Sequence, residues 1–256
     1  MRDDKTGDEF YIGWEENAPK HTGKLVRNVV VVLLGLAVVV PLVLLAAQGP
    51  FAPSVHEFGT IRSFEGTIRA TPYPQLDVDE PGAPGSVTTF HLVAPFKFGA
   101  DAYVADFDGQ RVRLDGTLNF RGGETMIEVV PDSISRIEGE AAPEPIAIGH
   151  GTHAMVGEIL DSKCYLGVMK PGEGKAHRAC AVRCLSGGIP PMFVLRDASG
   201  LPFDRLLLTD ADGGAIDFET IYPYVAETVE ITGEVTRHGR DLWVLQADAT
   251  SIRRVR

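Results

Sequence analysis

The chain has 256 residues and a formal net charge of −11. Its only basic run is residues 253–256, so the pattern argues against a nucleic-acid partner, which would need clustered Lys and Arg. An apolar segment near the N-terminus leaves about 200 residues after it, enough for one large or two small domains.

Residues 1–27 form a polar lead that is too short to fold alone. It carries an aromatic cluster at Phe10, Tyr11 and Trp14. We interpret this cluster either as a rest at the membrane interface or as a docking peptide that binds a partner.

Residues 28–48 are predicted to form one transmembrane helix. The stretch 29–47 contains no charged residue, and at about 1.5 Å rise per residue it can cross a hydrocarbon core of roughly 30 Å. Lys20, Lys24 and Arg27 precede it, whereas the next basic residue is Arg62. The positive-inside rule therefore predicts a single-pass protein of the bacterial inner membrane, with a cytoplasmic N-terminus and a periplasmic bulk. The alternative is a cleaved signal peptide, against which the acidic lead argues.

An internal repeat sets the expected architecture. Residues 64–68, 112–118 and 133–137 match residues 155–159, 229–235 and 251–255. Each copy alternates apolar and polar residues between glycine-rich turns, the pattern of antiparallel strands, and has a glycine in its first strand where a barrel strand bends. We expect a mainly β protein with two OB-like barrels, although an immunoglobulin-like sandwich remains an alternative.

The predicted barrels span residues 55–139 and 151–256, joined by a linker at 140–150. The second copy is longer than the first by about the length of the segment 161–190, which holds all three cysteines. Because the first copy lacks this insertion, we expect the barrel to fold without it and the insertion to carry function.

Within the insertion, a helix is predicted to place His177, Cys180 and Cys184 on one face. Cys164 enters from the preceding loop. Three thiols and an imidazole suffice for a tetrahedral zinc site, and thiolates also suit copper(I) or an iron–sulfur centre. His150 and His153 are additional candidate ligands.

Disulfide formation is the competing interpretation of the cysteines. An oxidising compartment favours a bridge from Cys164 to Cys180 or Cys184, with the remaining cysteine as a spare thiol. Three free thiols are the third alternative.

Four motifs carry a resemblance to membrane-anchored, extracytoplasmic bacterial proteins. These are the sequences DSKC at 161–164, HRACAVRC at 177–184, GGIPP at 187–191 and FYIGW at 10–14. The chain is similar to this group over most of its length. The resemblance implies the same topology and singles out Cys164, His177, Cys180 and Cys184, but it implies no particular activity.

Two functions follow as hypotheses. In the first, the protein is a non-catalytic accessory subunit that braces a membrane complex, for example one of electron transport, through its barrels. In the second, the cysteine insertion binds a metal or redox centre for electron transfer or metal delivery. No hydrolase, P-loop or metalloprotease motif occurs, so we do not expect an enzyme.

Overall fold

The computed structural model describes residues 19–48, 54–79 and 86–255. The chain forms two compact units, Met1–Ala52 and Pro53–Arg256. The predicted aromatic cluster at Phe10, Tyr11 and Trp14 lies outside the described residues.

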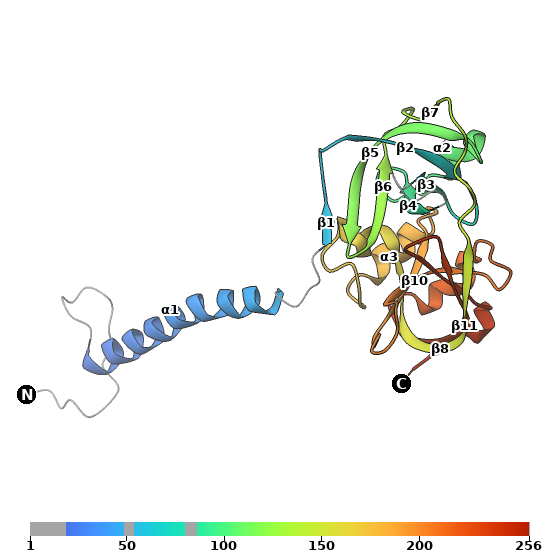
Figure 1. Ribbon diagram of the computed structural model, residues 1–256. Coiled ribbons are helices and arrows are strands. Elements are labelled where there is room, and N and C mark those ends of the chain that lie inside the picture. Colours follow the sequence, from blue (N-terminus) through green and yellow to red (C-terminus); the bar gives the residue numbers. More distant parts are fainter. Residues whose placement is uncertain (1–18, 49–53, 80–85, 256) are drawn as a thin grey trace, which may run out of the picture. The chain divides into compact units, whose positions relative to one another are not determined.

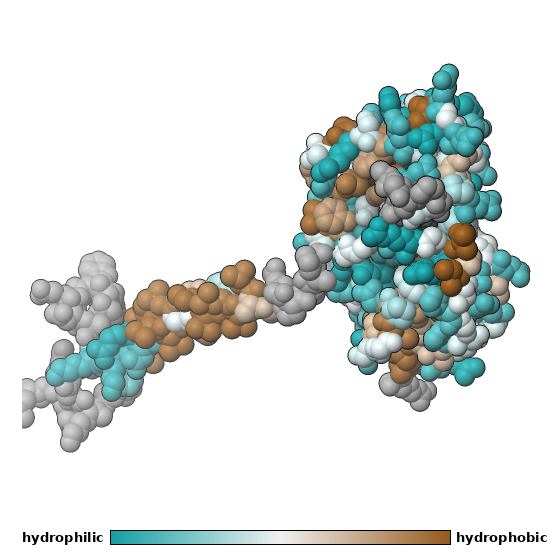
Figure 2. All heavy atoms as spheres, in the orientation of Figure 1, coloured by the Kyte–Doolittle hydropathy of each residue, from teal (hydrophilic) through white to brown (hydrophobic). Residues whose placement is uncertain are grey.

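The first unit contains one long helix, α1 (Lys20–Gln48). Its span Lys20–Ala47 is long and apolar enough to cross a membrane, and none of it is buried within the structure. Figure 2 shows hydrophobic residues along most of its surface. The helix begins eight residues before the predicted residue 28, so it includes the basic residues Lys20, Lys24 and Arg27. A helix that is apolar all round is typical of a membrane span.

The second unit contains two small β-barrels (Figure 1). The strands near and in the first barrel are β1 (Ser54–His56), β2 (Arg62–Arg69), β3 (Gln75–Asp79), β4 (Val87–Val93), β5 (Arg111–Arg121), β6 (Glu124–Val129) and β7 (Ser135–Arg136). Those of the second are β8 (Ala147–Asp161), β9 (Pro191–Leu195), β10 (Arg205–Thr209), β11 (Thr228–His238), β12 (Leu242–Gln246) and β13 (Arg253–Arg254). The short helices are α2 (Asp101–Val104), η1 (Ala105–Phe107), η2 (Cys164–Val168), α3 (Arg178–Leu185), α4 (Phe218–Ile221), η3 (Tyr222–Tyr224) and η4 (Ala249–Ser251).

Both barrels have the same strand order. The first runs β5-β2-β3-β4-β6 and closes through β5 and β6, and the second runs β11-β8-β9-β10-β12 and closes through β11 and β12. In each barrel one pair is parallel: β4 with β6 in the first and β10 with β12 in the second. The other pairs of barrel strands are antiparallel. This is the arrangement of an OB-like barrel, so the predicted fold class is confirmed.

Equivalent glycines allow each barrel to bend at the same point. A Cβ on Gly66 would collide with the carbonyl oxygen of Asp77 in β3, and one on Gly157 would collide with that of Val194 in β9. The neighbouring strands approach too closely for any side chain at these two positions. The glycine inside each first strand is therefore required by the closure of the barrel.

The second barrel begins earlier than its predicted boundary. Strand β8 starts at Ala147, inside the segment 140–150 that the sequence suggested as a linker, and pairs with β11 as far as His238. Residues 147–150 form part of β8 because β11, which has 11 residues, extends far enough to pair with them.

The cysteine insertion belongs to the largest hydrophobic core, contrary to the expectation that the barrel would not need it. Leu166, Leu185 and Ile189 are fully buried there, together with Val93 and Met126 of the first barrel. The insertion packs between the two barrels, so its apolar side chains are buried against both of them. A single barrel would have no such interface, which is why comparison with the first repeat did not reveal this packing. The segment therefore contributes both to the core and to the thiol cluster.

Candidate functional site

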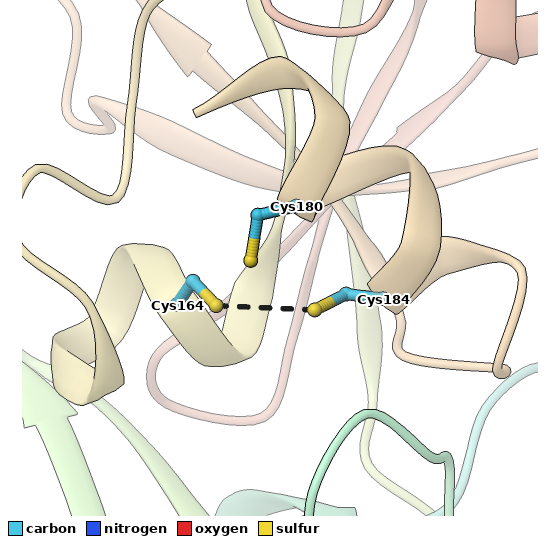
Figure 3. A group of neighbouring side chains, drawn as sticks. All are labelled: Cys164, Cys180 and Cys184. Atoms are coloured by element: carbon cyan, nitrogen blue, oxygen red, sulfur yellow. Dashed lines mark hydrogen bonds between the residues drawn. The ribbon is translucent and has the colours of Figure 1, made fainter. Parts of the chain in front are cut away.

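Three thiols converge where the insertion meets the first barrel (Figure 3). Cys164 lies on η2, directly after β8, whereas Cys180 and Cys184 lie one turn apart on α3. The three sulfur atoms lie within 4.8 Å of one another, and Sγ of Cys164 is 3.9 Å from Sγ of Cys184. Cys164 and Cys184 are buried and Cys180 is partly exposed. Thus the structure unites the three predicted cysteines.

The sulfur atoms have a spacing that a shared metal ion could bridge. All three cysteines are free, and 3.9 Å is far longer than an S–S bond of about 2.0 Å. Two thiolates that each lie about 2.3 Å from a shared ion would be roughly 4 Å apart. The cluster therefore has the spacing of a ligand set.

His177 is not part of the three-thiol cluster, although the sequence suggested one four-ligand set. It precedes the first residue of α3, and its Nε2 atom lies 2.9 Å from Oδ2 of Asp161. Asp161 is fully buried, and a buried carboxylate needs such a partner. His177, Asp161 and Cys164 form a second group of potential ligands that shares Cys164 with the first. An imidazole held by a carboxylate is typical of the surroundings of metal sites.

His150 and His153 lie away from the cysteines. Both lie on β8, where their rings pack against Trp243 and Phe203 with centroid distances of 4.6 and 6.0 Å. Among the described residues, neither belongs to a group of potential metal ligands with a cysteine. Their role in the structure is aromatic packing.

Lys97 is a site residue that the sequence did not reveal. Its Nζ atom donates to Sγ of Cys180 at 2.7 Å and lies 3.7 Å from Sγ of Cys184. The hydrogen bond to Cys180 raises the pKa of Lys97. No motif links this lysine of the first barrel to cysteines more than 80 positions away, so only the fold brings them together.

The pKa values of the two buried thiols, Cys164 and Cys184, are shifted in opposite directions. The hydrogen bond from Cys164 and the nearby charge of Lys97 lower the pKa of Cys184 against the effect of burial. The hydrogen bond to Cys184, together with burial, raises the pKa of Cys164. Cys184 is therefore the more readily ionised of the two.

Lys163 fixes the loop that carries Lys97. This lysine is only 2% exposed, and its Nζ atom contacts Oε2 of Glu128 at 2.5 Å. It also donates to the carbonyl oxygens of Ala94 at 2.9 Å and Phe96 at 2.8 Å. A cation from the insertion thus holds two acceptors and one carboxylate of the first barrel, directly beside Cys164.

An apolar cleft of about 390 Å³ leads to the cysteines. Cys164, Cys184 and Lys97 lie along it, and Phe96, Phe98 and Met169 form exposed parts of its wall. Phe96 is 84% exposed, which is unusual for a large aromatic side chain outside an interface. The cluster is therefore reachable from solvent through a hydrophobic entrance.

No protein-family model, curated protein or solved structure matches this chain. The class of protein is therefore defined by the features described above: an N-terminal helix able to span a membrane, tandem OB-like barrels, and a thiol cluster at the contact between the barrels.

Proposed function

We propose that this protein is a membrane-anchored carrier that binds one copper(I) ion through Cys164, Cys180 and Cys184. The observation that carries the proposal is the convergence of three sulfur atoms within 4.8 Å at the end of an open cleft. Soft thiolates select copper(I), and three of them form a trigonal ligand set.

The ligand count favours copper(I) over a structural zinc ion. A closed zinc site needs four protein ligands, and the fourth candidate, His177, is tied to Asp161. Copper(II) prefers tetragonal nitrogen and oxygen ligands, so an all-sulfur cluster does not suit a copper that cycles between two oxidation states. Metal delivery is thus favoured over electron transfer. The cationic Lys97 would offset part of the negative charge of three thiolates.

The proposal places the barrels outside the cytoplasm of a bacterium. Lys20, Lys24 and Arg27 lie at the N-terminal side of the apolar span, which supports a cytoplasmic N-terminus. A carrier on the outer side of the inner membrane would exchange copper with extracytoplasmic partners.

Copper(I) titration of the reduced, full-length protein in detergent tests this function. We expect one ion per chain, measured anaerobically by competition with a chromophoric copper(I) chelator. Replacing any one of the three cysteines by serine should weaken binding more than about 100-fold, because loss of an outer partner alone costs about 10–100-fold. His177→Ala should fall within that smaller range, and His153→Ala should bind like the unmodified protein. Binding by any of the three serine variants that is as tight as that of the unmodified protein would contradict the proposal.

The accessory-subunit function is a second candidate, supported by a different observation. Phe96, Phe98 and Met169 expose apolar surface beside the cleft, as a docking surface does. If the barrels brace a membrane complex, the protein should comigrate with larger membrane proteins after mild detergent extraction. A Phe96→Asp variant should lose that comigration while α1 keeps it in the membrane fraction; migration of the unmodified protein alone would contradict this candidate.

A further inference from the structure

We propose that Lys97 and Cys180 form a covalent N–O–S bridge when the metal-free protein meets dioxygen. The proposal rests on the contact between an amine and a thiol from different barrels. It uses a cysteine of the proposed copper site but does not depend on metal binding.

The contact is unusually close for its atom types. The distance of 2.7 Å from Nζ of Lys97 to Sγ of Cys180 equals the short limit of about 2.7 Å for hydrogen bonds between nitrogen and oxygen, although sulfur is the larger atom. The same nitrogen lies 3.7 Å from Sγ of Cys184. Insertion of one oxygen atom between nitrogen and sulfur therefore needs little movement at Cys180 and more at Cys184.

The backbone on both sides of Lys97 is fixed against the insertion. Before it, Lys163 binds the carbonyl oxygen of Phe96; after it, the amide of Gly99 donates to the carbonyl oxygen of Gly187 at 2.8 Å. A Cβ on Gly187 would collide with the carbonyl oxygen of Lys97. The segment around Lys97 and the end of the insertion are therefore packed backbone against backbone, which fixes the backbone of Lys97 beside the insertion.

Dioxygen can approach the contact between Lys97 and Cys180. Cys180 is the one partly exposed thiol of the cluster, whereas Cys164 and Cys184 are buried. Susceptibility to oxidation follows both the thiolate character and the exposure of a thiol, and it is the exposure that distinguishes Cys180. The apolar cleft is lined by Lys97, so dioxygen, a small apolar molecule, can also approach the nitrogen partner through it.

The reaction balances with one dioxygen molecule. The Lys97 ammonium first releases one proton to solvent. The resulting amine, written as NH₂, and the Cys180 thiol, written as SH, then each lose one hydrogen to form the NH–O–S linkage, and these two hydrogens leave with the second oxygen atom as water. Nitrogen and sulfur each lose two electrons, and the two oxygen atoms gain four. Nitrogen loses its two electrons when it bonds to the oxygen atom on sulfur, and the second oxygen atom of the same dioxygen molecule takes them up and leaves as water. Simple condensation of the amine with a sulfenic acid would instead give a direct N–S bond.

The bridge would act as an oxygen-dependent latch. It joins the loop of the first barrel to α3 of the second, and it removes Cys180 from the ligand set. Reduction with four hydrogen equivalents returns the amine, the thiol and water, so the latch is reversible.

Peptide mass spectrometry of the full-length protein tests the bridge. The protein is reduced in detergent, freed of metal with a chelator, exposed to air-saturated buffer and digested with trypsin without reductant. We expect most chains to yield one peptide pair that joins Lys97 to Cys180, with the mass of both peptides plus one oxygen and minus two hydrogens. Trypsin should not cleave after Lys97 in the linked chains, and an added thiol reductant should restore the separate peptides.

Two variants make the result decisive. Lys97→Arg keeps the positive charge but removes the amine, so it should yield no linked pair, and circular dichroism should show that it stays folded. Cys184→Ser should still form the link. A Cys180–Cys184 disulfide, a linked pair without the added oxygen, or Cys180 oxidised alone would each overturn the proposal. Failure of copper binding would leave this test unaffected, since no metal is present.

Discussion

Replacing residues 162–190 by a short turn should abolish cooperative unfolding of the barrels. The deletion removes Leu166, Leu185 and Ile189, each fully buried in the largest core. Truncation of one such leucine to alanine typically costs about 2–5 kcal/mol, whereas a whole domain is stable by about 5–15 kcal/mol. Loss of all three side chains would therefore cost about 6–15 kcal/mol, which is comparable to the whole stability of a domain. Circular dichroism and a thermal melt of the full-length protein in detergent would measure the result.

Single substitutions provide the matched control for this deletion. Leu185→Ala should lower the free energy of unfolding by about 3 kcal/mol, whereas Arg183→Ala on the same helix should change it by roughly 0.5 kcal/mol or less, because Arg183 is exposed. A deletion variant that melts cooperatively at the original temperature would show that the barrels do not need the insertion.

Lys163→Met should destabilise the contact between the barrels by about 3 kcal/mol. It leaves two carbonyl oxygens and the carboxylate of Glu128 without their cation, and loss of one partner of a buried ion pair typically costs about 3–5 kcal/mol. We take the lower end because Glu128 is 25% exposed and water can replace part of the contact. Denaturant unfolding followed by tryptophan fluorescence would measure the loss.

Glu128→Gln is the companion variant for the same contact. It keeps a hydrogen-bond acceptor for Lys163 and should cost only about 1 kcal/mol. Because Lys163 also binds the carbonyl oxygen of Phe96, Lys163→Met should additionally reduce formation of the Lys97–Cys180 link. Equal stability of both variants and the unmodified protein would show that the ion pair contributes nothing to the contact between the barrels.

Much of the fold follows from short-range signals in the sequence. The matched stretches at 112–118 and 229–235 form β5 and β11, and β7 and β13 pair with them at Val112 and Val229, the same position of the repeat. Strand alternation, a glycine at a forced bend and an uncharged apolar run each depend on neighbours within a few residues. Such signals survive without knowledge of the tertiary structure.

The candidate site was predictable only in part, because only some of its residues are neighbours in the sequence. Cys180 and Cys184 are one helical turn apart, so their common face follows from local geometry, and Cys164 follows from the density of cysteines in one segment. The predicted role of His177 as a fourth member of the cluster depended on a helix that was expected to include it, whereas α3 begins one residue later. The residue that holds it, Asp161, lies on β8.

The sequence by itself determined the long apolar helix, the repeated barrel and the segment that holds the thiols, since each follows from local periodicity and composition. Only the tertiary structure decided that Lys97 faces Cys180, that Lys163 joins the barrels, and that the insertion is core. These contacts join residues from different barrels. Their energies come from burial and charge at an interface that exists only after both barrels have folded, and no local pattern encodes that interface.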